Sequence, residues 1–226
     1  LKSRWQKFEQ KMLSQPDLND SSLLTYNYWL QVILKELNYG DIQPPDQPLV
    51  IEDKEFPVSH QWHHIPVHLV GFNQDLDKRL SSSIGLISPH GLIQNLLNRS
   101  DKHLWGFVSN GLLFRILRKN LSLTRQAYLE FDLKTIMQGE LYPDFKLFWL
   151  LCHQSRVKVE KAEKLHECWL EKWSKQASEE GTRALDKLRD GVIEAIQQLG
   201  KGFISYKGNH ELINRFKSGD LELKDF

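Results

Sequence analysis

The sequence has few of the residues that mark disulfide-rich or membrane-spanning proteins. Its 226 residues include only two cysteines, Cys152 and Cys168, which excludes a small disulfide framework and favours free thiols in a reducing compartment. No apolar run approaches the roughly 20 residues that a membrane-spanning helix needs, and no signal-peptide pattern is present. We therefore expect a cytoplasmic protein with no membrane partner.

Net charge is also nearly absent. Thirty Lys and Arg residues oppose 29 Asp and Glu residues, so the formal net charge is +1. No global electric field draws such a chain toward nucleic acid or an anionic membrane. Any phosphate-binding site must therefore depend on a local group of basic residues.

Three common enzyme signatures are missing. The chain has no GxSxG elbow, no Walker phosphate-binding loop and no GxGxxG after a predicted strand. The glycines of "LGKGF" (199–203) are better explained as a helix end, with Gly200 or Gly202 just beyond the last turn. Three large enzyme classes thus lose their usual support.

The hydrophobic pattern predicts an α+β protein that ends in a long helix. Apolar spacings of three and four predict helices over 21–38, 90–100 and 142–155, and from about 167 to 199. Buried or alternating runs predict strands over 67–72, 104–109, 112–117 and 126–133, and the proline-rich stretch 44–57 predicts a loop. The last helix would be about 45 Å long, so it suggests a connector or a bundle seam.

The stretch "DKHLWGFVSNGLLFRILRKN" (101–120) predicts a hairpin that turns at Asn110 and Gly111, because both residues tolerate positive φ angles. Basic residues follow along its second strand and beyond it, namely Arg115, Arg118, Lys119 and Arg125. They are candidate phosphate contacts for DNA. The alternative is a solvated hairpin end.

Two further groups could carry metal chemistry. Asp46, Glu52 and Lys54 mimic the Mg²⁺-binding signature of restriction-type nucleases, although their spacing is short and a proline lies between the acids. The histidines His60, His63, His64 and His68 suggest a Zn²⁺ site, but no Cys or paired carboxylate lies at a usual interval. For both groups we expect ordinary strand and loop residues, with no metal and no catalytic residue.

Several motifs resemble one family of enzymes. The motifs are "LWGFVSNG" with "FRILR", then "LTRQAYLEFDL", and finally "GTRALDKLRDGV". Over roughly residues 20–226 the chain resembles the N-terminal region of Type IIG-like adenine-specific DNA methyltransferases, which belong to bacterial restriction-modification and phage-defence systems such as DISARM and BREX. The resemblance implies a parent enzyme that transfers a methyl group from S-adenosylmethionine to adenine N6.

The residues for that methyl transfer are missing from this chain. It contains no glycine-containing cofactor loop. It also contains no Asn-Pro-Pro-Tyr or Asp-Pro-Pro-Tyr tetrapeptide, because its one Pro-Pro pair, Pro44-Pro45, is followed by Asp46. The resemblance therefore implies a catalytic core after Phe226. It also implies that DNA and this core of the same chain are partners, and that S-adenosylmethionine binds elsewhere.

The resemblance further implies a small mixed nuclease-like sheet with flanking helices. An active nuclease would present Glu-x-Lys on the strand before the 90–100 helix, where this chain has "VHLVGFNQDLDK". We expect the nuclease-like fold to be retained and its catalysis lost. The expected organisation is an N-terminal helix or arm over 1–20, a degenerate nuclease-like domain over 21–140, and a helical connector over 141–226.

Two other functions stay open at this point. An active nuclease module would need Asp46, Glu52 and Lys54, or Asp75 and Asp77, to converge on Mg²⁺. A protein-interaction platform for other defence subunits would use the two tryptophans of the long helix, Trp169 and Trp173, as anchors. Mg²⁺-dependent cleavage of DNA would identify the nuclease module. Absence of DNA affinity would identify the protein-interaction platform.

Overall fold

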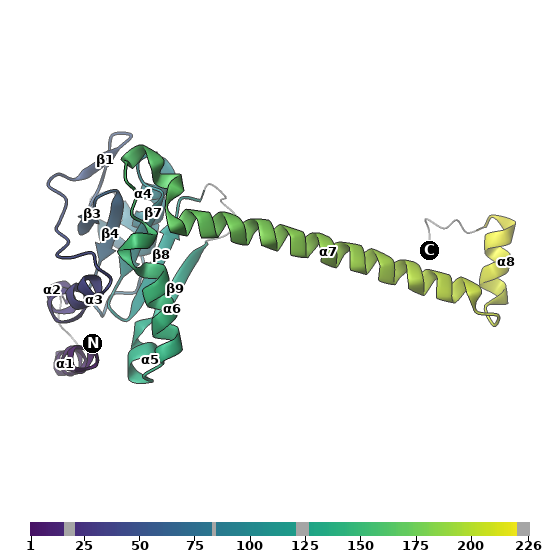
Figure 1. Ribbon diagram of the computed structural model, residues 1–226, viewed down its shortest axis with the longest axis horizontal. Helices are drawn as coiled ribbons and strands as arrows, with labels where there is room; N and C mark the ends of the chain where they lie inside the picture. Colours follow the sequence, from purple (N-terminus) through teal and green to yellow (C-terminus); the bar gives the residue numbers. More distant parts are fainter. Residues whose placement is uncertain (16–20, 83–84, 121–126, 221–226) are drawn as a thin grey trace. The chain divides into compact units, whose positions relative to one another are not determined.

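The computed structural model describes residues 1–15, 21–82, 85–120 and 127–220. They form two compact units, Leu1–Lys172 and Trp173–Phe226. The first unit contains the strands and most of the helices, and the second is helical (Figure 1). The predicted α+β class is confirmed, with a small mixed sheet, flanking helices and a long helix after them.

A five-stranded sheet in the order β3-β4-β7-β8-β9 forms the centre of the first unit. Its strands are β3 (His60–Trp62), β4 (Ile65–Leu69), β7 (Trp105–Ser109), β8 (Leu113–Arg118) and β9 (Tyr128–Asp132). Only β4 and β7 pair in parallel, and the other neighbours are antiparallel. A parallel pair needs a crossover, and helix α4 (Pro89–Arg99) is part of it.

Each face of the sheet has its own apolar layer. On one face, Val108 and Leu117 belong to a buried cluster with α4, whose Ile93, Leu96 and Leu97 are fully buried. On the other face, Phe114 contacts Phe107 of β7 and Phe148 of α6, at ring-centroid distances of 5.5 and 5.4 Å. Alternation along β8 therefore decides which side chains point toward α4.

The remaining helices of the first unit come before and after the five-stranded sheet in the sequence. They are α1 (Lys2–Ser14), α2 (Ser22–Thr25) with a π segment (Tyr26–Leu30) and α3 (Gln31–Glu36), α5 (Leu133–Gln138), α6 (Tyr142–Cys152), and two 3₁₀ segments (Gln154–Arg156 and Ala162–Glu167). Trp5 and Phe8 of α1 are buried, and both rings pack on Trp29. The first unit thus includes the expected N-terminal arm and runs past the expected boundary at 140, because α6 packs on the sheet.

Two short hairpins precede α4, and the first of them lies in the predicted proline-rich loop. The proline-rich stretch contains β1 (Leu49–Ile51) and β2 (Lys54–Phe56), which pair only with each other. A second hairpin, β5 (Leu80–Ser82) with β6 (Gly85–Ile87), precedes α4. Neither hairpin is part of the five-stranded sheet.

The turn between β7 and β8 differs in detail from its prediction. Gly111 has φ +81°, but Asn110 does not have a positive φ, and the strands flank three residues instead of two. The side-chain oxygen of Asn110 accepts hydrogen bonds from the backbone N–H groups of Leu112 and Leu113. The carbonyl of Gly111 accepts a hydrogen bond from the Trp29 indole at 2.9 Å, so α1–α3 and the turn are joined.

Helix α7 (Trp169–Ser205) is longer than the pattern predicts. Gly200 and Gly202 lie inside it, so their prediction as the helix end was wrong. In the second unit α7 is followed by α8 (His210–Ser218), which ends at Gly219 with φ +80°. Within the described ranges, none of the helices has the length and apolar composition that crossing a membrane requires.

Candidate functional site

The predicted basic group does not form one surface. Along β8, Arg115 points toward α4 with Leu113 and Leu117, whereas Arg118 points to the opposite face of the sheet with Phe114. Arg125 lies outside the described residues. The side-chain alternation of β8 therefore separates Arg115 from Arg118, and their contact with DNA stays a prediction.

Arg115 is a buried cation with two carboxylate partners. Its side chain is 5% exposed, and its Nη1 and Nη2 donate to the two oxygens of Asp77 at 2.7 and 2.8 Å. Its Nε donates to Glu130 of β9, the residue directly opposite in the sheet register. The ring of Tyr128 lies 4.6 Å from the guanidinium carbon. Arg115 thus serves an internal charge cluster and not a phosphate on the surface.

His90 completes this cluster from the first turn of α4. Its Nδ1 lies 3.3 Å from Nη1 of Arg115, so the ring faces the cation with its lone pair. Burial first, and then the charge of Arg115, lower the pKa of His90. The hydrogen bonds from Arg115 lower the pKa of Asp77, and the two carboxylates outweigh burial to raise the pKa of Arg115. The cluster at pH 7 therefore sets a neutral His90 beside the ion pair of Arg115 and Asp77.

Arg118 and Lys119 are also paired. Arg118 donates from Nε and Nη2 to both oxygens of Glu171 in the first turn of α7, at 2.8 and 2.5 Å. Lys119 donates to Asp101 at 2.8 Å and to the carbonyl of Ser100 at 2.9 Å. The charges at the end of the hairpin therefore connect it to the start of α7 and to the end of α4.

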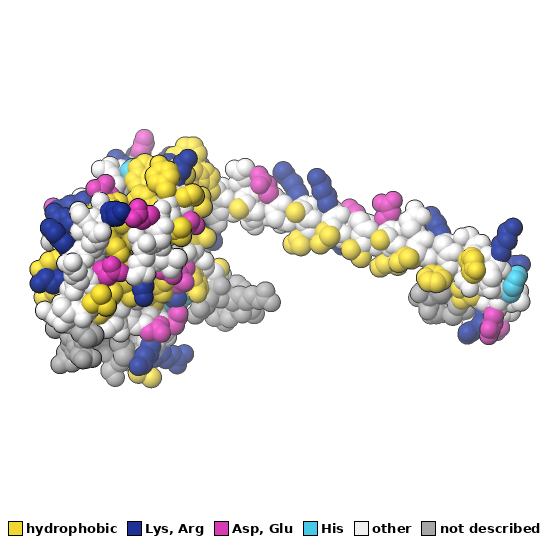
Figure 2. Space-filling model, turned by 90° about the horizontal axis from the view of Figure 1, so that it is seen from below, with side chains coloured by type: hydrophobic (Ala, Val, Ile, Leu, Met, Phe, Trp, Pro, Cys, Tyr) yellow, Lys and Arg dark blue, Asp and Glu magenta, His cyan; other side chains and the backbone are white. Residues whose placement is uncertain are grey.

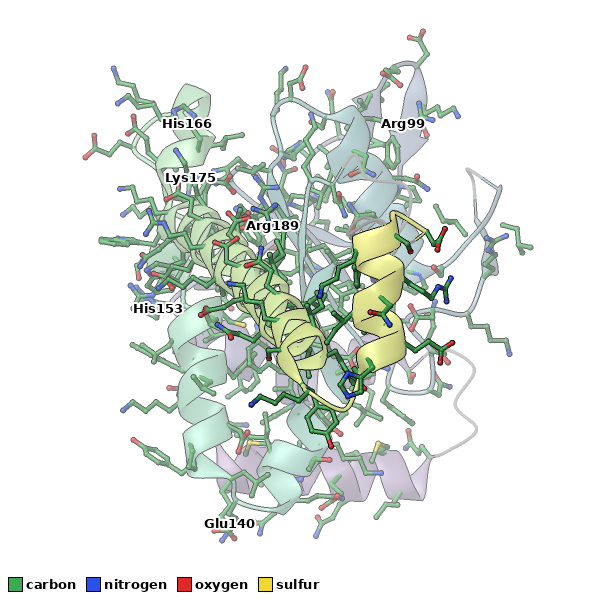
Figure 3. All side chains as sticks on the ribbon, turned by 90° about the vertical axis from the view of Figure 1, so that its right-hand side faces the viewer. Arg99, Glu140, His153, His166, Lys175 and Arg189 are labelled. Atoms are coloured by element: carbon green, nitrogen blue, oxygen red, sulfur yellow. The ribbon has the colours of Figure 1, made fainter. Side chains whose placement is uncertain are left out.

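The acidic residues of the nuclease alternative do not come together. Glu52 lies in the β1–β2 turn, where it pairs at 2.5 Å with Arg99 at the end of α4, which Figure 3 labels. Asp46 and Lys54 are exposed on the same small hairpin region, apart from the five-stranded sheet. Asp75 accepts a hydrogen bond from the backbone of Asp77, whose own carboxylate is bound by Arg115.

The four histidines of the zinc alternative make different contacts. His60 stacks on Tyr26 at 4.6 Å, and His63 lies in a turn with φ +49°. His64 contacts a backbone carbonyl, and burial lowers the pKa of His68 to about 4. In the part of the chain that the structure describes, no three His, Cys, Asp or Glu side chains are arranged to hold a metal ion.

A cavity of about 720 Å³ opens beside these histidines, at the edge of the sheet. Three segments line it: the end of β3 with the following turn, the loop after α4, and the loop before the second 3₁₀ segment. His64 Nε2 donates to the carbonyl of Val157 at 3.0 Å, and His103 Nδ1 donates to the carbonyl of His64 at 2.7 Å. These two hydrogen bonds hold the three walls together.

The second unit carries an uncovered apolar face on α7. Leu185, Leu188, Val192, Ile196, Leu199 and Phe203 are each between 50% and 68% exposed. Their spacings of three and four span about five turns of helix without drift, so they form one straight stripe. Figure 2 shows hydrophobic side chains along one side of α7. We call these six residues the α7 stripe.

Small residues lie along one border of the α7 stripe. On a helix of 3.6 residues per turn, Ala184, Gly191, Ala195 and Gly202 fall beside it. Lys175 and Arg189, which Figure 3 labels, fall on the other border. A row of large side chains next to a row of small ones can take the ridge of a second helix at close range.

Sequence reasoning missed the charge cluster, the cavity and the exposure of the α7 stripe. One signal was present for the first of these, because Arg115 occupies a position of β8 that alternates with core residues. The partners of Arg115 are 38 and 15 residues away along the chain, and no spacing rule connects them.

Comparison with known proteins found no matching family model, no matching curated protein and no matching solved structure. The family resemblance and the function it implies therefore stay predictions.

Proposed function

We propose that this chain is the non-catalytic, DNA-engaging and scaffolding N-terminal region of an adenine-N6 DNA methyltransferase of a restriction-modification or phage-defence system. The observation that carries the proposal is the α7 stripe, six large apolar side chains that stay exposed on one helix. Exposed apolar patches of this size mark interaction surfaces. The methylase core, which supplies the S-adenosylmethionine chemistry, is the proposed occupant.

The motifs of the resemblance supply the second support. The strand motifs "LWGFVSNG" and "FRILR" form most of β7 and β8, two inner strands of the five-stranded sheet. The last motif, "GTRALDKLRDGV" (181–192), supplies the first half of the α7 stripe. Motif residues at the centre of the sheet are explained by packing, whereas Leu185, Leu188 and Val192 stay 68%, 65% and 50% exposed among the described residues. A docking role would explain them.

The geometry of the acidic residues supports the non-catalytic part of the proposal. Glu52 and Asp77 are each bound by an arginine, and they lie on different structures of the first unit. Two-metal or one-metal hydrolysis of DNA needs carboxylates that converge on a shared cation. A cytoplasmic location fits the two free, buried cysteines.

The proposal is tested by the adenine-methylation pattern of the cell that carries the gene. Removing the gene, or replacing Leu188 and Ile196 together by Glu, should abolish N6-methyladenine at one sequence motif. The matched control replaces Arg183 and Lys187 by Glu, which changes charge on the opposite, polar side of α7 and should leave the pattern intact. An unchanged pattern after removal of the gene would refute the proposal.

A further inference from the structure

The cavity at the edge of β3 combines features that the proposed function has not used. Its volume of about 720 Å³ lies within the range of small-molecule and cofactor sites. Lys102 and Lys158 line it, and neither makes an ion pair with any described residue. Arg115, Arg118 and Lys119, the described members of the predicted basic group, are all paired with carboxylates, so Lys102 and Lys158 are the better candidates for an anion.

Two of the histidines that line the cavity each have one ring nitrogen left as a hydrogen-bond acceptor. Because His64 Nε2 and His103 Nδ1 each donate to a backbone carbonyl, the other ring nitrogen of each carries the lone pair. Burial lowers the pKa of both rings, so both stay neutral at pH 7. Neutral rings of fixed tautomer can accept from amino groups, such as those of a nucleobase.

An aromatic wall and a modest net charge complete the site. Trp62 lines the cavity and is held edge-on by Tyr39, with ring centroids 5.0 Å apart. Asp101 also lines it, but Lys119 pairs with that carboxylate. Glu160 is then the one lining carboxylate without a described ion-pair partner. Its single negative charge is smaller than the two positive charges of Lys102 and Lys158.

We propose that this cavity binds a nucleotide, either free or as a unit of single-stranded DNA, with its phosphate at Lys102 and Lys158 and its base against Trp62. Aromatic side chains bind bases through their faces, and lysines bind phosphate through charge. The inference deepens the DNA-engaging part of the proposed function and rests on it for the choice of DNA. It replaces the β8 hairpin as the contact surface.

The test is a titration of a short fluorescent single-stranded DNA with the purified chain, with dAMP and inorganic phosphate as competitors. Replacing Lys102 and Lys158 by Ala should weaken binding about tenfold and flatten its salt dependence. The control replaces Lys134 and Lys146, two exposed lysines without described ion pairs, and should change affinity by less than about twofold. Competition by dAMP as strong as by unlabelled DNA would identify a free nucleotide as the ligand.

A second variant separates a nucleotide site from a bare phosphate site. Trp62→Leu keeps both lysines. It should therefore weaken the binding of DNA and of dAMP, while competition by inorganic phosphate stays unchanged. Equal losses for the cavity pair and the control pair would overturn the proposal, as would no binding by the unmodified chain. Such a failure leaves the α7 stripe and the methylation pattern untouched, so it is distinct from a failure of the proposed function.

Discussion

The two units differ in whether their charged or apolar side chains have partners inside the unit. In the first unit, charges at the sheet are neutralised inside the unit: Arg115 meets Asp77 and Glu130, and Arg118 meets Glu171. In the second unit, the large apolar side chains of the α7 stripe stay in solvent. The apolar side chains of the α7 stripe are informative because they stay at least half exposed among the described residues, whereas these charges of the first unit are paired internally.

The largest expected effect lies in the core of the first unit. Phe114→Ala should lower the free energy of unfolding by about 3–5 kcal/mol, because Phe114 is fully buried between Phe107 and Phe148. Leu188→Ala in the α7 stripe is the matched control, with an expected change of at most about 0.5 kcal/mol. Urea unfolding measures both. Equal losses would mean that the stripe is buried in solution.

Removal of the buried guanidinium should cost less than removal of the core ring. Arg115→Ala leaves Asp77 and Glu130 without a cation, but these carboxylates are 54% and 34% exposed and can be hydrated. We expect a loss of about 2 kcal/mol in the same unfolding experiment. Lys134→Ala, at an exposed site, should be neutral. A neutral Arg115→Ala would show that the charge cluster does not stabilise the first unit.

Replacing glycine by alanine should have a smaller effect on stability, with opposite signs in the β7–β8 turn and in α7. At Gly111, φ is +81° and an added Cβ would lie 2.6 Å from Cγ2 of Thr25, so Gly111→Ala should destabilise by about 1–2 kcal/mol. At Gly181 in α7 nothing lies within 4 Å of the added Cβ. Gly181→Ala should therefore stabilise the helix by up to about 1 kcal/mol. Thermal unfolding followed by circular dichroism would detect a failure of this contrast.

Acid should weaken the first unit more than α7. Burial lowers the pKa of His68 to about 4, below the value of about 6.5 in an unfolded chain. The unfolded state then binds more protons between these values, so stability should fall as the pH drops from about 6.5 to 4. His68→Leu should flatten this part of the profile. Asp77, whose pKa Arg115 lowers, would contribute only at still lower pH.

Local sequence patterns predicted helices and strands, whereas tertiary contacts determined which side chains lie together. The apolar spacing of α4 and the apolar runs of β7 and β8 were sufficient to predict these elements, because both patterns reflect burial within one element. The mixed sheet was expected from the family resemblance. The side-chain alternation of β8 places Arg115 and Arg118 on opposite faces of the sheet, which could have been inferred from the strand assignment alone.

The candidate sites could not be predicted in the same way. The cavity brings together residues near 62, 102 and 158, which only the fold places side by side. The α7 stripe has the same sequence pattern as a buried helix face. Periodicity indicates that a face is apolar, but it cannot show whether anything covers that face.

The most direct test of the central claim is the thiol-labelling rate of Val192→Cys in the isolated chain and in the assembled methyltransferase. Background labelling should be low, because Cys152 and Cys168 are buried and burial raises the pKa of both thiols. Arg183→Cys, on the opposite side of α7, is the control. We predict that assembly slows labelling at residue 192 alone. Equally fast labelling of Val192→Cys in the assembly would contradict docking through the α7 stripe.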